Sequence, residues 1–302
     1  MQWKLDKDIT VEIASQVLEE QLFTVEDIKI LGQGFDNVAL LVNHNLVFRF
    51  PRHSNADIYQ LKNENPILQK LQSVISLKIP NPIYIGRPTS YYPYHFQGYE
   101  KIEGVAVYQV DLTEQELLSC LKNLALFLKQ VHSITALQAQ NWGLERSGYD
   151  HTCIETMLEA LQPRIDSIIA QNIFELDLSF IATEIEIAKT IKIPDDADCL
   201  IHGDLHFKHI IMKDKKLIGI IDWGDVDINH PVVDFAIIHE LFPVSMHNVF
   251  FELYCNIDLK IWQYARFLAL KSIITSILCG YDTKDQQLFD AAVQAYKRLK
   301  NS

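Results

Sequence analysis

The side chains best suited to chemistry are gathered between Leu200 and Asp225, in the segment LIHGDLHFKHIIMKDKKLIGIIDWGD. Phosphoryl transfer needs one carboxylate that orients the acceptor hydroxyl and takes its proton. It needs a second carboxylate for the metal ion on the nucleotide phosphates, and a further metal ligand five positions after the first. Asp204 and Asp222 are suited to the two carboxylate roles, and His209 has the spacing of the further ligand.

Two short apolar runs must position these residues. Ile210 to Met212 and Leu217 to Ile221 are rich in Ile and are joined by the polar turn Lys213 to Lys216. Such runs on either side of a polar turn favour a β-hairpin over one helix. The hairpin would return Asp222 to the loop that holds Asp204.

The pair HGDLHFKH and IDWG resembles the signature HGDxHxxN, strand and IDW of the aminoglycoside phosphotransferase and kinase-like superfamily. The resemblance covers about residues 25–280 and is most specific over 201–236. It implies an α+β, two-lobed protein-kinase-like fold. We therefore expect a small N-terminal nucleotide-binding lobe of antiparallel sheet plus helix over 1–103, and a mostly helical C-terminal lobe over 104–302 that carries the catalytic loop and the substrate cleft.

The resemblance also implies roles for the loop residues. Asp204 would be the catalytic base, and Asp222 and His209 would hold Mg²⁺. His209 stands where the family commonly has Asn, and imidazole is a less usual magnesium ligand than a carbonyl oxygen. Macrolide phosphotransferases resemble this chain in carrying His there, in a segment like HGDLHPGHIL.

A possible glycine loop lies far upstream of the catalytic segment in the sequence. Residues 28–42 read as strand, Gly turn and strand, in which Gly32, Gly34 and Asn37 would let the backbone cover the phosphates of ATP or GTP. Gly-x-Gly alone is equally typical of an ordinary hairpin, so this interpretation depends on the downstream motif.

The strand Leu46 to Phe50 matches the strand on which the family carries a phosphate-binding lysine. Here the matching residue is Arg49, whose planar guanidinium replaces the compact ammonium group of lysine. Its helix partner would be Glu64. Because Pro66 restricts Asn65 to non-helical angles, we expect the helix to begin near Pro66 instead of running through Glu64.

Two further strands, Ile79 to Gly86 and Tyr94 to Ile102, lead to a hinge at Glu103–Gly104. In the family the nucleotide base binds the backbone there, which assigns Glu100 and Ile102 to cofactor binding. Sequence does not choose between ATP and GTP.

Helical periodicity marks the remaining elements. We expect His132 and His202 to be structural and Asp234 to brace the catalytic loop, although Asn229 and His230 replace Gly and Asp of the family's GDPxxD. Carboxylates of this region hold substrate ammonium groups in aminoglycoside kinases, and our candidate is Glu240. The expected helices are Thr10–Gln21, Thr113–Ser133, most of 150–192, Phe235–Leu241, Val249–Tyr254, Leu259–Cys279 and Gln286–Leu299.

Several alternatives stay open. The acceptor could be an aminoglycoside, which we favour, a macrolide, or a metabolite such as choline, homoserine or a sugar. The chain could also be a nucleotide-binding pseudokinase. A third possibility is a metallohydrolase with zinc or iron on the cluster of imidazoles and carboxylates, which are ordinary ligands for these metals. The cluster consists of His202, His206, His209, Asp204 and Asp222.

The composition of the chain favours some classes of binding partner over others. The 302 residues carry 39 acids against 27 bases and a net charge of -12, so nucleic acid is a poor candidate and a cationic small molecule is a better one. Five scattered cysteines argue against a disulfide framework or a zinc ribbon. We find neither a membrane span nor a signal peptide, and expect a cytoplasmic monomer or weak dimer.

Overall fold

The computed structural model describes residues 9–34, 36–194, 197–255 and 257–302, so Phe35 of the predicted glycine loop lies outside the described residues. The chain divides into two compact units. The main segment of the first unit ends at Glu103, and the second unit continues from Gly104. Two short segments depart from that division, because Trp142–Leu144 belongs to the first unit and Val74–Leu77 to the second.

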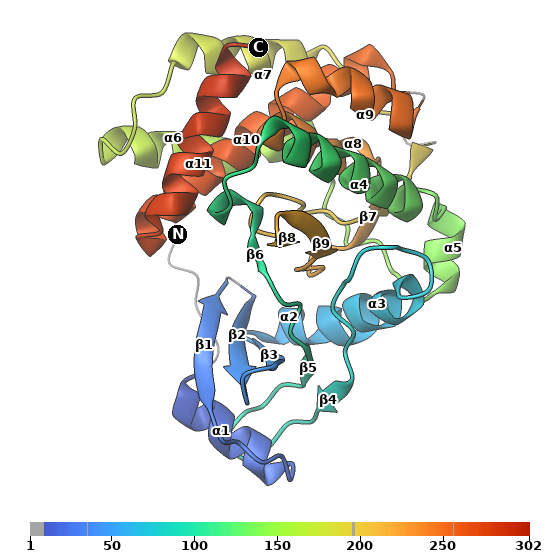
Figure 1. Cartoon of the computed structure of the whole chain (residues 1–302), viewed down its shortest axis with the longest axis vertical. Helices are drawn as coiled ribbons and strands as arrows, with labels where there is room; N and C mark the ends of the chain where they lie inside the picture. The colour runs from blue at the N-terminus through green and yellow to red at the C-terminus, as the bar shows by residue number, and fades with distance from the viewer. Residues whose placement is uncertain (1–8, 35, 195–196, 256) are drawn as a thin grey trace. The chain divides into compact units, whose positions relative to one another are not determined.

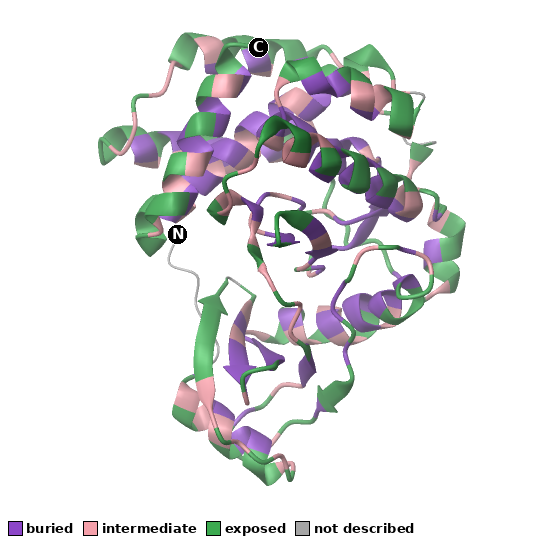
Figure 2. Cartoon of the chain, in the orientation of Figure 1, coloured by how far each residue is buried: buried purple, intermediate pink, exposed green. Residues whose placement is uncertain are grey.

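The first unit is built on a five-stranded antiparallel sheet with the order β1-β2-β3-β5-β4. The segments NVALLV and LVFRFP consist largely of the β-branched, aliphatic and aromatic residues that suit a buried strand. Accordingly β2 and β3 are mostly buried and β1 is mostly exposed (Figure 2). The strands are β1 (Ile28–Gln33), β2 (Asn37–Val42), β3 (Leu46–Pro51), β4 (Tyr84–Gly86) and β5 (Phe96–Glu100).

Helix α1 (Val11–Glu20) contributes to the core of this unit. It begins as expected after Thr10, whose hydroxyl accepts a 3.3 Å hydrogen bond from the N–H of Ile13. Its buried face packs in one apolar cluster with the sheet, where the rings of Phe50 and Phe96 stack 4.5 Å apart. This core holds β3, and with it Arg49, in place.

The helical segment after β3 contradicts the expectation for Pro66. Helix α2 (Ser54–Tyr59), a π-helical turn (Gln60–Glu64) and helix α3 (Asn65–Leu71) follow without a break. Asn65 keeps helical angles of -62° and -47°, and its N–H donates to the carbonyl of Gln60. The wider π turn places proline where its missing N–H is tolerated, so the helix runs through Glu64.

The second unit is mostly helical, and helix α10 is its central element. This helix contacts α6, α7, α8 and α11, and it is lined with buried apolar residues (Figure 1, Figure 2). The helices are α4 (Glu114–His132), α5 (Ala136–Asn141), α6 (Ile154–Ala170), α7 (Leu178–Lys189), α8 (Val232–Leu241), α9 (His247–Tyr254), α10 (Leu259–Thr283) and α11 (Gln286–Lys300). The expected helices are present, and α8 begins earlier and α10 ends later than predicted.

Two small sheets complete the second unit. In one, β10 (Asp227–Asn229) pairs with β7 (Cys199–Ile201). The other has the order β6-β8-β9 and consists of β6 (Val105–Ala106), β8 (Ile210–Lys213) and β9 (Lys216–Ile220). The predicted hairpin is therefore present, and its turn residues Asp214 and Lys215 have φ of 48° and 59°, as a two-residue turn between twisted strands requires.

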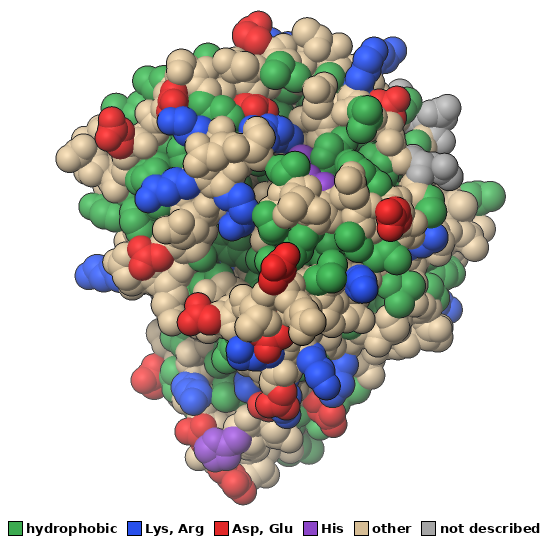
Figure 3. Space-filling view, turned by 45° about the horizontal axis from the view of Figure 1, so that its top comes forward, with side chains coloured by type: hydrophobic (Ala, Val, Ile, Leu, Met, Phe, Trp, Pro, Cys, Tyr) green, Lys and Arg blue, Asp and Glu red, His purple; other side chains and the backbone are tan. Residues whose placement is uncertain are grey.

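The architecture is the expected α+β arrangement of an antiparallel sheet followed by a helical unit. Acidic and basic side chains are interspersed on the face shown in Figure 3. Among the described residues, no helix combines the length and the apolar character that crossing a membrane requires.

Candidate active site

The loop after β7 carries the predicted base. Asp204 is half exposed, with 51% of its side chain accessible. Its backbone carbonyl lies 2.8 Å from Nδ1 of His209, and its Oδ2 lies 3.6 Å from Nε2 of His206. The short loop therefore holds one carboxylate toward solvent and two imidazoles beside it.

The hairpin brings Asp222 to the same place. Nε2 of His209 lies 3.3 Å from Oδ2 of Asp222, and the Ile221 N–H donates a 2.9 Å bond to the carbonyl of His209. Asp222 has φ of 64°, a left-handed conformation that costs a non-glycine residue about 1–2 kcal/mol. Such strain is typical of functional positions.

His206 is the residue that sequence reasoning did not assign to the phosphotransfer site. Its ring lies against that of His209, with centroids 3.9 Å apart, and the ligand atoms of Asp204, His206 and His209 lie within 4.8 Å of one another. Burial lowers the pKa of His206 to about 4, so its imidazole is neutral at pH 7. The signal was available in the sequence as the histidine two positions after Asp204.

Protonation in the loop is set by these contacts. Partial desolvation by the surrounding protein atoms opposes ionisation of Asp204, but the neighbouring His206 and His209 hold the pKa of its carboxyl below the usual value of 3.8. Asp204 is therefore ionised at neutral pH. It can accept a hydrogen bond from an acceptor hydroxyl and orient that hydroxyl for attack.

Asp234, in the first turn of α8, holds the catalytic loop in place through hydrogen bonds. Its carboxylate, which has no exposed surface, accepts bonds from the backbone N–H groups of His202 at 2.8 Å and Gly203 at 3.0 Å. The same carboxylate lies 3.0 Å from Nε2 of His132. The expected bracing role of Asp234 and the structural roles of His132 and His202 agree with these contacts.

Gly203 makes this arrangement possible. Its φ is 86°, and a Cβ added there would clash with the backbone carbonyl of Asp225. Only glycine suits both the left-handed backbone and the close approach.

In the first unit, Arg49 and Glu64 form a buried ion pair, with 7% and 1% of their side chains exposed. Nε2 of Gln97 donates a further 3.3 Å bond to Glu64. The predicted partnership therefore exists. Burial holds the guanidinium in one place, because a buried charge must remain paired.

The glycine loop lies between β1 and β2. The N–H of Gly34 donates a 2.8 Å bond to the carbonyl of Asn37, and a side-chain nitrogen of Arg52 lies 2.7 Å from the carbonyl of Gly34. A Cβ on Gly32 would meet no described residue within 4 Å, so packing against the described part of the chain does not require that glycine. Of the two predicted hinge contacts, Glu100 is the exposed last residue of β5, and Ile102 follows β5 and is partly exposed.

Glu240 does not lie where a dissolved substrate could touch it. Its side chain has no exposed surface, and neither carboxylate oxygen has a hydrogen-bond partner among the described residues. Burial raises the pKa of this carboxyl to about 8. The sequence pattern located Glu240 on the correct helix but did not reveal that α10 and α11 cover it.

The first unit has an antiparallel sheet with an adjoining helix, and the helical second unit carries Asp204, His209 and Asp222. These features define a kinase-like phosphotransferase. The model of the phosphotransferase enzyme family (APH) matches residues 27–268, and the chain belongs to that family.

Solved structures with this fold include aminoglycoside and macrolide phosphotransferases. The GDP complex of aminoglycoside 2'-phosphotransferase-IIIa has a TM-score of 0.71 at 22% identity, with 97% of this chain and 99% of that chain covered. The gentamicin complex of APH(2")-IIa has a TM-score of 0.59 at 21% identity, with 97% of each covered. Macrolide 2'-phosphotransferase MphH from Brachybacterium faecium has a TM-score of 0.62 at 14% identity, with 94% and 98% covered. At these identities the similarity establishes the fold and leaves the acceptor open.

Proposed function

We propose that this enzyme moves the γ-phosphate of ATP or GTP to a hydroxyl of a small molecule, with an aminoglycoside antibiotic as the first candidate acceptor. The observation that carries the proposal is the placement of Asp204, His209 and Asp222 around one loop, with a 3.3 Å approach between His209 and Asp222. Positioning and charge neutralisation provide most of the rate in phosphoryl transfer, and this loop can do both.

Asp204 would orient the acceptor hydroxyl and accept its proton. Asp222 and His209 would hold Mg²⁺, which supplies charge neutralisation on the nucleotide phosphates when bound. The donor set fits a divalent cation because a carboxylate oxygen and a buried imidazole nitrogen are already close together. The same donors could bind zinc or iron in a metallohydrolase. Measuring the metal content of the purified protein tests this alternative, which predicts stoichiometric zinc or iron.

The residues of the first unit would bind the nucleotide. Arg49, held by Glu64, would steady the phosphates, and the loop containing Gly32, Gly34 and Asn37 would cover them. Backbone groups near Glu100 and Ile102 would bind the base.

The acidic balance of the chain and the kanamycin and gentamicin complexes of structural neighbours support a cationic acceptor. Because Glu240 has no exposed surface, it is not assigned to the acceptor in this proposal. His209 and the macrolide phosphotransferase neighbour support a macrolide as the second candidate. We place the reaction in the cytoplasm and the protein as a monomer or weak dimer.

The test is magnesium-dependent release of ADP or GDP by the purified protein, with ATP and GTP run separately against aminoglycosides and macrolides. Asp204→Ala is the matched control, because it removes the base and leaves the proposed nucleotide contacts. We expect one acceptor class to stimulate release in the wild type only. Wild-type turnover in Asp204→Ala would remove Asp204 from the mechanism, and nucleotide binding without any turnover would favour a pseudokinase.

A further inference from the structure

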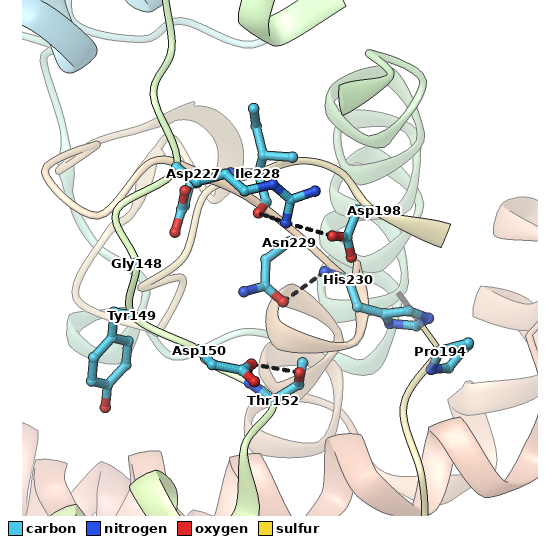
Figure 4. A pocket seen from close by; sticks show the side chains of 11 residues that line it. Gly148, Tyr149, Asp150, Thr152, Pro194, Asp198, Asp227, Ile228, Asn229 and His230 are labelled. Carbon is cyan, nitrogen blue, oxygen red and sulfur yellow. Dashed lines mark hydrogen bonds and ion pairs between the residues drawn. The ribbon is translucent and has the colours of Figure 1, made fainter. Parts of the chain in front are cut away.

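A cavity of about 330 Å³ lies beside β10 in the second unit (Figure 4). Its walls come from β10, from the segment that enters α6, and from Pro194 and Asp198, which lie between α7 and β7 in the sequence. Asp204, His209 and Asp222 are not among its lining residues. The cavity therefore differs in composition from the phosphotransfer loop.

The side chain that points to a ligand is Asn229, which is only 8% exposed. Its Oδ1 accepts a 2.7 Å bond from the N–H of His230, and its Nδ2 makes no hydrogen bond to any residue in 9–34, 36–194, 197–255 or 257–302. Figure 4 shows this nitrogen on the side away from His230, among the lining residues. Water that enters the cavity can satisfy this donor, and an acceptor atom of a ligand can replace that water.

Charged groups of both signs surround this amide. Arg146, whose side chain is 47% exposed, donates at 2.6 Å to Asp198 and at 3.1 Å to the carbonyl of Ile228. Oδ1 of Asp150 accepts hydrogen bonds from the N–H and from the hydroxyl of Thr152. The cavity thus offers donors and acceptors side by side.

Hydroxyl groups suit such a lining because each one donates and accepts. Asp150, Asp198 and Asp227 outnumber Arg146 among the charged lining residues, so a neutral or cationic ligand is favoured over an anion. Tyr149, which is 44% exposed, offers an aromatic face at the rim. A water molecule takes about 30 Å³ in the liquid, so the volume corresponds to about ten waters, enough for one sugar ring.

We propose that this cavity binds a small polyhydroxylated molecule, the size of one sugar ring and neutral or amine-bearing, with Nδ2 of Asn229 donating to a ligand hydroxyl. Two lining residues distinguish this cavity, because Asn229 and His230 stand where the family motif GDPxxD has Gly and Asp. β10 pairs with β7 in the register Asn229↔Cys199, so the ligand would lie beside the strand that leads into the catalytic loop.

The test uses the full chain without nucleotide, so that it stands apart from the phosphotransfer assay. Saturation-transfer NMR and titration calorimetry would measure binding of methyl glucoside, methyl glucosaminide, methyl glucuronide and propylammonium. We expect the first two to bind, and the anionic glucuronide to bind about tenfold more weakly. Propylammonium lacks hydroxyls and should not bind.

Two variants and one control locate the binding. Asn229→Leu removes the amide at similar volume and should weaken sugar binding about tenfold. Tyr149→Ala changes an exposed rim residue, so it keeps the test valid if Asn229→Leu fails to fold, and it should weaken binding about threefold. Tyr281→Ala, at a tyrosine of similar exposure on α10, should leave binding unchanged.

Three outcomes would overturn the proposal. They are the absence of binding by either uncharged or amine-bearing sugar, equal affinity in wild type and in both pocket variants, and propylammonium binding as tight as that of the glucosaminide.

Discussion

His209 and Asp222 approach each other within 3.3 Å, between Nε2 and Oδ2, although the whole β8–β9 hairpin separates them in the sequence. We predict that His209→Asn, which restores the residue common in the family, raises the affinity for Mg²⁺ relative to Mn²⁺. An amide oxygen is a harder ligand than an imidazole nitrogen, and we expect a change of about three- to tenfold in the affinity ratio.

The measurement is calorimetric binding of a non-hydrolysable nucleotide with each metal, and His206→Asn serves as the matched control. An unchanged metal ratio in His209→Asn would show that His209 is not a metal ligand.

Asp234 should be essential for the shape of the catalytic loop. Asp234→Asn replaces an acceptor oxygen by an amino group that faces donors from His202, Gly203 or His132. Loss of these charge-assisted bonds should lower the free energy of unfolding by about 3 kcal/mol and kcat by about a hundredfold. Chemical denaturation and steady-state kinetics would check both numbers, and a stable variant with full kcat would contradict the bracing role.

The Arg49–Glu64 pair should stabilise the first unit. Glu64→Gln removes the buried carboxylate charge that the Arg49 guanidinium contacts, which costs about 3 kcal/mol. Thermal unfolding would report the loss, and nucleotide affinity should fall with it because Arg49 is no longer held in one place. Glu103→Gln, at an exposed acid paired with Lys101, is the control and should change the free energy of unfolding by less than about 1 kcal/mol. Equal effects of the two substitutions would exclude a special role for the buried pair.

Glu240 should make stability depend on pH. Its folded pKa of about 8 lies above its ordinary value of 4.5, so the folded state holds this proton more tightly than the unfolded state. The stabilisation is complete below about pH 4.5 and is lost as the pH rises through 8.

Glu240→Gln should remove this dependence, because a glutamine stays neutral. Between pH 5 and 9, the free energy of unfolding of the wild type should fall relative to the variant by on the order of 3 kcal/mol. Urea denaturation at several pH values gives the comparison. Parallel pH profiles would mean that Glu240 is ionised in the folded protein.

Much of the architecture follows from local sequence. The polar turn between two Ile-rich runs predicts the β8–β9 hairpin, and the leucine spacing after Thr113 predicts α4 almost to the residue. The motif from His202 to Asp222 identifies the loop that the structure brings together. These features depend on neighbours in sequence, so propensity and periodicity are sufficient to predict them.

Other features needed the tertiary structure. The local geometry of Pro66 predicts that a helix begins there. In the structure a π turn precedes Pro66, so the helical segment is continuous through Glu64. Glu64 lies within this segment and forms a buried pair with Arg49. The spacing of α8 could not show that Glu240 lies under α10 and α11, nor could the chain order show that Nδ2 of Asn229 lacks a hydrogen-bond partner in the described part of the chain. The sequence by itself determined the local elements and the chemistry of the catalytic loop. Only the tertiary structure decided which polar groups are buried and paired, because burial is set by segments distant in sequence.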